Sequence, residues 1–249
     1  MKIEKYKKGA KGTYQVFFDD GSVLSFYEEV ILKYDLLLKK EISLELLHEA
    51  NLSNQEWDVY YVALNSIKHR FRSVHELKQI LLRKEYPMDL IDKAVSKLLD
   101  QGYLNDRSFA KSYINSQMLT TNKGPYKLEK ELLEKGIDTS IIQDEISVFG
   151  EEEQLVRIDK LIQKGIKTNH NRGGVVLKQK IYNDLKNLGY DITFLNRSFS
   201  SYSFENDLDI ARKEYEKLYR KYSRKYSGNE LKRIVNEKLY QKGLRYEEK

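Results

Sequence analysis

The sequence predicts a mainly α-helical protein, with tandem three-helix repeats in an elongated, curved array and a small β-hairpin module at the N-terminus. Two observations predict this fold class. Four amphipathic segments end in a similar way, and their end points are spaced by 51, 53 and 54 residues. A fixed period of this size is typical of arrays in which each unit buries its apolar face against its neighbours. Only two prolines occur in 249 residues, which suits a largely helical chain. The four end points are Tyr86, Ile137, Tyr190 and Leu244.

Residues 1–52 are expected to form the hairpin module. Tyr14–Phe18 and Val23–Phe26 are rich in aromatic and branched residues, and they flank an Asp-Gly turn. Asp-Gly between two such runs favours a β-hairpin. We expect Lys2–Tyr6 to add a third strand. Helical patterns follow, first over residues 28–38 and then in a short helix over residues 43–50.

The first three-helix repeat is expected over residues 53–104. Ser53 and Ser73 each stand three residues before a glutamate, and this capping-box spacing predicts that each begins a helix. Pro87 stands where the third helix should start, and Gly102 should close that helix. The buried face of the first helix is expected to carry Trp57, Tyr61, Leu64, Ile67 and Phe71.

The second repeat is expected over residues 105–150, the third over residues 151–204, and an incomplete fourth over residues 205–249. The middle helix and its end span 13 residues in the first two repeats and 16 in the last two. Three residues are almost one helical turn. We therefore expect longer middle helices in the third and fourth repeats.

Composition places the chain among cytoplasmic proteins. There are no cysteines, which excludes a disulfide framework and thiolate-ligated zinc and fits a reducing compartment. The N-terminal segment lacks the apolar run of a signal peptide. No stretch approaches the roughly 18 consecutive apolar residues of a membrane span. We therefore expect no contact with a membrane, and we expect a monomer.

Positive charge is concentrated near the C-terminus. From Arg212 onward there are 13 Lys and Arg residues against 6 Asp and Glu, whereas the whole chain carries a net charge of +6. A basic end on a nearly neutral body favours contact with a polyanion, either nucleic acid or an acidic protein surface. A solvated helical face would give the same pattern, and the sequence leaves both readings open.

The sequence contains no recognisable catalytic set. The four histidines (His48, His69, His75 and His170) are scattered, and no carboxylate or thiol at ligand spacing joins them. No Ser/His/Asp arrangement or isolated carboxylate pair stands apart from the charged background. We expect a protein that is not an enzyme and that uses no cofactor and no metal.

The basic C-terminal helix also carries a stripe of tyrosines. Tyr215, Tyr219, Tyr222 and Tyr226 recur at helical spacing on one face. Rings beside cations could stack on bases, but a tyrosine stripe is more often the buried seam of a repeat. We expect the rings to be buried and the cations around them to bind the partner.

Three clusters of cations are the predicted partner-binding residues. One lies in the first repeat, one in the second, and one on the basic C-terminal helix. In that order they are Arg70, Arg72, Lys78 and Arg83; Lys123, Lys127 and Lys130; and Lys213, Lys217, Arg220, Lys221 and Arg224.

Three stretches of this sequence resemble the RecX family of bacterial regulatory proteins. They are Arg72-Ser73-Val74-His75-Glu76-Leu77, Gly102-Tyr103-Leu104-Asn105-Asp106 with Phe109-Ala110, and Gly124-Pro125-Tyr126-Lys127-Leu128 with residues 131–137. The likeness is specific over residues 60–145. The hairpin module and the later repeats resemble the longer forms of low-GC Gram-positive bacteria.

The resemblance implies a chain of three-helix repeats that binds the recombinase RecA and RecA–DNA filaments. It implies that such a protein modulates, mostly by inhibition, recombinase, ATPase and co-protease activity in homologous recombination, DNA repair and the SOS response. Weak binding to DNA alone is part of the same expectation. The motif residues Leu77, Leu132, Gly102 and Gly136 are expected to be structural, because they occupy apolar and capping positions. The alternative hypothesis is a general nucleic-acid-binding helical repeat protein.

Overall fold

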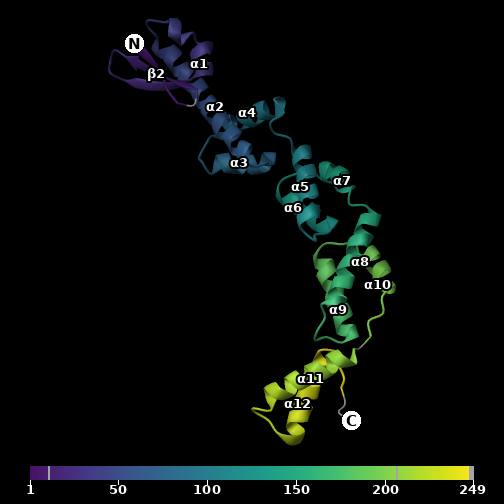
Figure 1. Ribbon diagram of the computed structural model, residues 1–249. Helices are drawn as coiled ribbons and strands as arrows, with labels where there is room; N and C mark the ends of the chain where they lie inside the picture. The colour runs from purple at the N-terminus through teal and green to yellow at the C-terminus, as the bar shows by residue number, and fades with distance from the viewer. Residues whose placement is uncertain (11, 206, 247–249) are drawn as a thin grey trace. The chain divides into compact units, whose positions relative to one another are not determined.

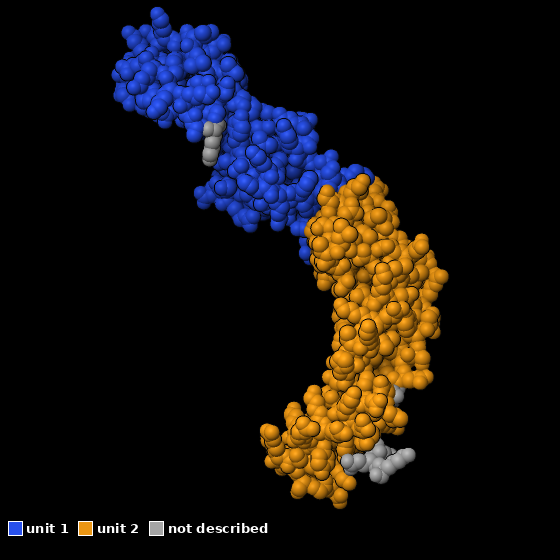
Figure 2. Space-filling model, viewed as in Figure 1, with its two compact units in different colours: residues 1–110, 133–141 blue, residues 111–132, 142–249 orange. Residues whose placement is uncertain are grey.

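The structure is a computed structural model that describes residues 1–10, 12–205 and 207–246. This part of the chain contains three strands and twelve α-helices (Figure 1). The chain divides into two compact units (Figure 2). Unit 1 comprises Met1–Ala110 and Leu133–Ile141, and unit 2 comprises Lys111–Leu132 and Ile142–Lys249.

The N-terminal module is an antiparallel sheet with the strand order β1-β2-β3. Its strands are β1 (Ile3–Lys8), β2 (Thr13–Phe18) and β3 (Val23–Tyr27). Gly21 occupies the turn between β2 and β3 with φ of +81°, a conformation that glycine adopts without steric cost. Both the predicted hairpin and the predicted third strand are confirmed.

Helix α1 (Glu28–Lys33) packs on this sheet, and the 3₁₀-helix η1 (Leu36–Leu38) contributes Leu36 to the same core. The core between them is apolar and includes Phe18, Phe26 and Ile31, each only 1% exposed. The module therefore has a hydrophobic core of its own, as a three-stranded sheet requires for stability.

The prediction of two helices, over residues 43–50 and from Ser53 onward, is wrong, because α2 (Leu44–His69) spans both. It is one continuous helix of 26 residues, capped by Ser43, whose side chain accepts a hydrogen bond from the Leu46 amide. Ser53, the predicted start of a second helix, lies inside α2 and is buried. The boundary predicted after residue 52 thus falls within a helix that belongs to both the module and the first repeat.

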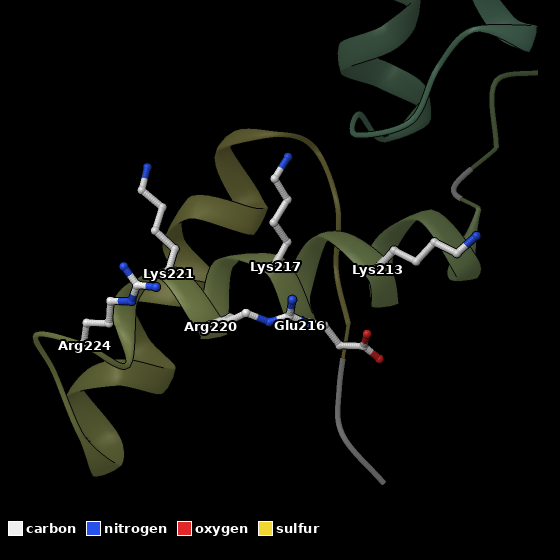
Figure 3. Close-up of a pocket in the computed structure, with 6 residues that line it drawn as sticks. All are labelled: Lys213, Glu216, Lys217, Arg220, Lys221 and Arg224. Atoms are coloured by element: carbon white, nitrogen blue, oxygen red, sulfur yellow. The ribbon is translucent and has the colours of Figure 1, made fainter.

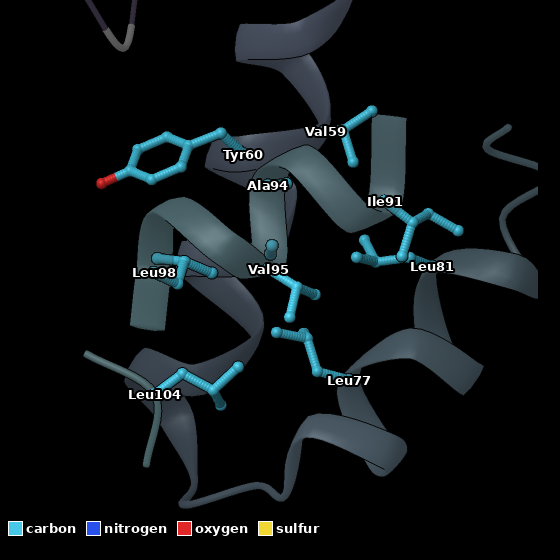
Figure 4. Packing of buried hydrophobic residues seen from close by; sticks show 10 residues of the cluster. Val59, Tyr60, Leu77, Leu81, Ile91, Ala94, Val95, Leu98 and Leu104 are labelled. Atoms are coloured by element: carbon cyan, nitrogen blue, oxygen red, sulfur yellow. The ribbon is translucent and has the colours of Figure 1, made fainter. Parts of the chain in front are cut away.

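The first repeat consists of the second half of α2 with α3 (Val74–Leu82) and α4 (Met88–Asp100). Their apolar faces converge on one core (Figure 4). Leu77, Leu81, Ile91 and Leu98 are fully buried there. As predicted, Ser73 caps α3 by accepting a hydrogen bond from the Glu76 amide at 3.0 Å.

A cluster of tyrosine hydroxyls joins the hairpin module to the first repeat. Tyr27 from β3 and Tyr86 from the end of the α3 segment both donate to the Asp58 carboxylate, at 2.9 and 2.7 Å. Tyr61 donates to Glu29. Burial raises the pKa of Tyr61, and the hydrogen bond to Glu29 and the negative charge of Glu29 raise it further, to about 12. Since these hydroxyls stay protonated far above neutral pH, they are permanent donors in this junction.

Six helices, joined by short loops, lie between residues 106 and 200. They are α5 (Asp106–Thr120), α6 (Pro125–Glu134), α7 (Thr139–Ile146), α8 (Glu151–Lys167), α9 (Gly174–Asn187) and α10 (Ile192–Ser200). The middle helices α3 and α6 have 9 and 10 residues, whereas α9 has 14. The prediction of a longer middle helix in the third repeat is confirmed.

The last helices of the described chain, α11 (Leu208–Tyr222) and α12 (Gly228–Gln241), pack against each other. Helix α12 has 14 residues, as expected for the longer type of middle helix. Their shared core contains Tyr215, Leu218, Leu231, Val235 and Leu239. Buried Glu214 anchors the pair by accepting a hydrogen bond from Lys242 at 2.7 Å.

The middle helices of neighbouring repeats meet at three places, which we call repeat joints, and the same hydrogen-bond pattern occurs at each. Each joint contains a left-handed glycine after a middle helix: Gly136 after α6, Gly189 after α9 and Gly243 after α12. The carbonyl before that glycine accepts a hydrogen bond from the capping residue of the preceding repeat's middle helix. The bonds are Ser73 Oγ to Lys135 O (2.7 Å), Gly124 N to Leu188 O (2.7 Å) and Gly173 N to Lys242 O (2.8 Å).

The same joints leave no room for side chains at their glycines. A Cβ on Gly136 would lie 2.7 Å from His75 Cγ, and one on Gly189 would lie 2.5 Å from the Lys127 amide nitrogen. One on Gly243 would lie 2.6 Å from Val176 Cγ2. These glycines therefore combine a positive φ with a close approach to the neighbouring helix, and both demands exclude other residues. The first joint lies within unit 1, and the other two lie within unit 2.

Candidate partner-binding surface

The basic face of α11 brings five predicted cations together. Ala211, Tyr215 and Leu218 are buried against α12, as is Glu214. The opposite side of the helix faces solvent because of the helical period. The exposed cations are Lys213, Lys217, Arg220 and Lys221 on α11 and Arg224 in the turn that follows it, and with Glu216 they line a shallow hollow of about 350 Å³ (Figure 3). We call this surface the α11 basic face.

Like charges repeat at helical spacing along the α11 basic face. Lys213, Lys217 and Lys221 are spaced four residues apart within α11. Such pairs destabilise an isolated helix by about 0.2–0.5 kcal/mol each. Lys217 and Lys221 extend in the same direction (Figure 3). A bound anion would relieve this repulsion, so the face is electrostatically suited to a polyanionic partner.

The tyrosine stripe matches the predicted buried seam only in part. Tyr215 is 5% exposed, and Tyr222 and Tyr226 pack against the same core while remaining partly accessible. Tyr219 differs, because it is 39% exposed with its ring 6.0 Å from that of Tyr215. The stripe therefore holds α11 in place and orients the cations outward.

The four predicted cations of the first repeat do not form one site. Lys78 pairs with Asp92 at 2.7 Å, and Arg83 is exposed at the C-terminal cap of α3. Arg70 lies 3.3 Å from Glu76, and Arg72 Nε donates to the Ser66 carbonyl at 3.1 Å. Of the four, Arg70 and Arg72 line a common cleft near the end of α2.

Glu76 links this region to the first repeat joint. Its carboxylate accepts a hydrogen bond from Lys135 at 2.9 Å. Burial opposes its ionisation, but the hydrogen bond and charge of Lys135, together with the charge of Arg70, outweigh burial and lower the pKa of Glu76. Arg70 thus has a structural partner within unit 1 as well as an exposed position.

In the second repeat the three predicted cations divide into two kinds. Lys123 lies 2.8 Å from Glu131 and donates to Gln117 at 2.9 Å, and its side chain is only 25% exposed. It holds the loop before α6 in place. Lys127 and Lys130 are exposed on α6 and are available to a partner.

The sequence prediction was wrong for one aromatic residue of the cleft near the end of α2. Phe71 was expected on the buried face of a helix, but α2 ends at His69 and Phe71 is 69% exposed. Tyr103, part of the Gly102-Tyr103 motif, is 62% exposed. Two large exposed rings in one cleft were not evident from periodicity, because both residues lie outside the helices. The signal that could have identified them is their position in the sequence, because Phe71 stands between Arg70 and Arg72 and Tyr103 follows Gly102.

Two further findings concern the described residues. None of their helices is long and apolar enough to cross a membrane. Among the same residues, no group of three or more His, Asp or Glu side chains is placed to hold a metal ion.

Comparisons with known proteins agree over most of the chain. Residues 60–98 match the first three-helix domain of RecX, and residues 105–145 match the second. The regulatory protein RecX of Listeria monocytogenes serotype 4a is 32% identical over 95% of this chain and 89% of its own length. That of Streptococcus gordonii is 31% identical over 99% of this chain and 96% of its own.

Solved structures show the same fold. A crystal structure of regulatory protein RecX has a TM-score of 0.71 at 23% identity, over 80% of this chain and 99% of that one. RecX from Lactobacillus salivarius gives a TM-score of 0.56 at 24% identity, over 59% of this chain and 96% of that one.

Proposed function

Because this chain belongs to the RecX family of regulatory proteins, we propose that it binds RecA and RecA–DNA filaments. In this proposal it modulates, mostly by inhibition, the recombinase, ATPase and co-protease activities of RecA. It acts in the cytoplasm as a binding protein, with no catalytic chemistry, cofactor or metal of its own.

The observation that supports the proposal most directly is the α11 basic face. Four exposed cations of α11 and Arg224 in the turn after it line one hollow with a single carboxylate, Glu216, and the buried seam of α11 holds this surface against α12. A filament of protein on DNA offers both acidic side chains and phosphates, and either would neutralise these charges. Exposed Lys127, Lys130 and Arg83 are the further contacts that we assign to the partner.

Charge reversal on α11 tests the proposal. The triple variant Arg220→Glu, Lys221→Glu, Arg224→Glu should bind RecA–DNA filaments at least about tenfold more weakly, because each lost contact with an anionic partner costs about 1 kcal/mol or more. Circular dichroism should show unchanged helicity, since all three side chains are exposed. Co-sedimentation with filaments formed on single-stranded DNA gives the affinity.

A control with the same change of charge separates a local contact from a general electrostatic effect. Lys111, Lys160 and Lys186 are exposed on other helices, and their replacement by Glu should leave filament binding within about twofold if the contact is local. Equal losses in the two triple variants would contradict the assignment of α11.

A general nucleic-acid-binding protein is the second candidate, because the α11 basic face would also suit phosphates alone. Neutralising several phosphates makes binding fall steeply with salt. Binding to single-stranded DNA without RecA, as tight as binding to the filament and with the same salt dependence, would favour this candidate.

A further inference from the structure

We propose that a cleft in unit 1 binds an acidic segment of a protein partner through one apolar anchor side chain. The cleft lies between the end of α2, the linker to α3 and the turn after α4, and it measures about 880 Å³. We call it the aromatic-basic cleft. Its principal residues are Leu64, Ile67, Lys68, Arg70, Phe71 and Tyr103.

The aromatic rings of this cleft are not explained by packing. Phe71 is 69% and Tyr103 is 62% exposed, although the leucine that follows Tyr103 is buried in the repeat core. Large rings left in water cost free energy that a partner can recover by covering them. Phe, Tyr and Arg are also residue types that are enriched in the centres of protein interfaces.

Backbone geometry holds both rings at the rim. Helix α2 ends at His69, and Arg70 is extended with φ of −161° and ψ of 138°. Ser73 then begins α3, so the short linker cannot return Phe71 to the helix face. After α4, Gly102 adopts φ of +71° and ends the α4 segment directly before Tyr103. Both rings are thus presented by fixed turns.

The charge of the aromatic-basic cleft selects an acidic partner. Lys68, Arg70 and Arg72 line it, and none of the described lining residues is Asp or Glu. Outside the lining, the Glu76 carboxylate lies 3.3 Å from Arg70 and offsets part of its charge. Arg72 is held by its hydrogen bond to the Ser66 carbonyl, and its remaining guanidinium donors suit a carboxylate. Because this cation is already ordered, it loses little entropy when a partner binds.

The floor of the cleft favours protein over nucleic acid. Leu64 and Ile67 are aliphatic and half-buried, and they offer a surface for a leucine, isoleucine or phenylalanine side chain. The two exposed rings alone would also suit a nucleobase, but the aliphatic floor of the cleft adds surface that an apolar side chain uses and a base does not. An apolar floor with a basic rim therefore matches a peptide in which acidic residues flank one apolar residue.

This inference rests on the proposed function only in taking RecA as the source of the segment. A synthetic peptide tests the cleft itself. The probe is a short fluorescein-labelled peptide of Glu and Gly with one central Phe, and binding is measured by fluorescence anisotropy. Wild-type protein should bind it, and a matched peptide with Ser in place of Phe should bind at least about tenfold more weakly.

Ring deletion locates the binding. The variant Phe71→Ala, Tyr103→Ala should bind the Phe peptide at least about tenfold more weakly than wild type and should keep the same circular dichroism. Tyr240→Ala is the matched control, because Tyr240 is a 65% exposed tyrosine in unit 2, and it should bind like wild type. Failure of the wild type to bind the Phe peptide, or equal binding by the double variant, would overturn the inference.

Two further arms distinguish the partner classes. If ring deletion weakens binding of labelled oligothymidylate and leaves the Phe peptide unaffected, the cleft is a nucleic-acid site and the inference fails. In co-sedimentation with RecA filaments, wild-type protein that does not bind would refute the proposed function while leaving the peptide result standing. Filament binding that ring deletion leaves unchanged would remove RecA as the source of the segment.

Discussion

Replacing Gly136 by alanine should destabilise unit 1 much more than the same change at Gly102. Both glycines follow a helix and have nearly equal φ angles, +73° and +71°. In a left-handed conformation an L-residue costs about 1–2 kcal/mol, and this cost is common to both variants. They differ only in their surroundings. At Gly102, nothing among the described residues lies within 4 Å of an added Cβ, whereas at Gly136 the Cβ would meet His75.

The extra cost at Gly136 follows from the first repeat joint. Non-bonded carbon atoms prefer about 3.5–4.0 Å, but the new Cβ would lie 2.7 Å from His75 Cγ. The joint must open by about 1 Å, which breaks the 2.7 Å hydrogen bond from Ser73 Oγ to the Lys135 carbonyl. A hydrogen bond contributes about 1 kcal/mol, and lost packing should add a similar amount. Gly136→Ala should therefore cost about 3–4 kcal/mol, against about 1–2 kcal/mol for Gly102→Ala.

Urea unfolding followed by tryptophan fluorescence measures this difference. Trp57 is the only tryptophan, and it packs against the core of the hairpin module and the core of the first repeat. Its signal therefore reports the unit in which both glycines lie. If Gly136→Ala lowers the unfolding free energy no more than Gly102→Ala, the steric account of the repeat joint is refuted.

Three other predictions follow from named contacts. Lys135→Met should destabilise unit 1 at neutral pH and lose its effect in acid. The folded-state pKa of Glu76 is lowered, so the stabilisation is present above the ordinary pKa of a glutamate and is lost as the pH falls through the lowered folded-state value. Urea unfolding of the wild type and the variant measures this, and a difference in unfolding free energy that stays constant as the pH falls would contradict the pairing. Burial and the hydrogen bond to a carboxylate raise the pKa of Tyr86 to about 12, so folding is favoured below pH 10 and this contribution is lost between pH 10 and 12. Tyr86→Phe should flatten that alkaline loss, and a loss of the same size would exclude Tyr86 as its source. Lys123→Met should lower the thermal midpoint by a few degrees, because it removes the half-buried ion pair with Glu131. Lys127→Met should leave the thermal midpoint unchanged and weaken filament binding. A lower midpoint for Lys127→Met, with weaker filament binding for Lys123→Met instead, would show that the two roles are exchanged.

Local signals in the sequence predicted much of the fold because short-range chemistry determines those elements. The Asp-Gly turn between aromatic runs gave the hairpin, and Ser73 with Glu76 gave the start of α3. The extra turn of α9 and α12 could be counted directly. In each case the determining contacts lie within a few residues along the chain.

The same kind of signal failed at Ser53. Its spacing to Glu56 is that of a capping box, yet α2 continues through it because both halves of the helix bury apolar side chains. Ala50 packs with the hairpin module, and Val59 packs with the first repeat. Tertiary burial on both sides outweighs one local capping preference of about 1 kcal/mol. The predicted boundary at residue 52 was therefore placed inside a helix.

The candidate surfaces were predictable only in part. Periodicity placed the cations of the α11 basic face on the outside of the helix, and the structure gathers them around one hollow. It could not separate Lys123 from Lys127, because the difference depends on Glu131 and Gln117 as partners. The repeat joints were also beyond it, since their hydrogen bonds join residues such as Ser73 and Lys135 that are 62 positions apart.

The single-stranded-DNA-dependent ATPase rate of RecA tests the central claim most directly. This protein is titrated in at amounts well below one molecule per RecA, and its binding to the same DNA without RecA is measured alongside. The account predicts that ATPase activity falls at concentrations that leave the DNA largely unoccupied. Loss of activity only when the protein coats the DNA would contradict it and would support simple competition for the strand.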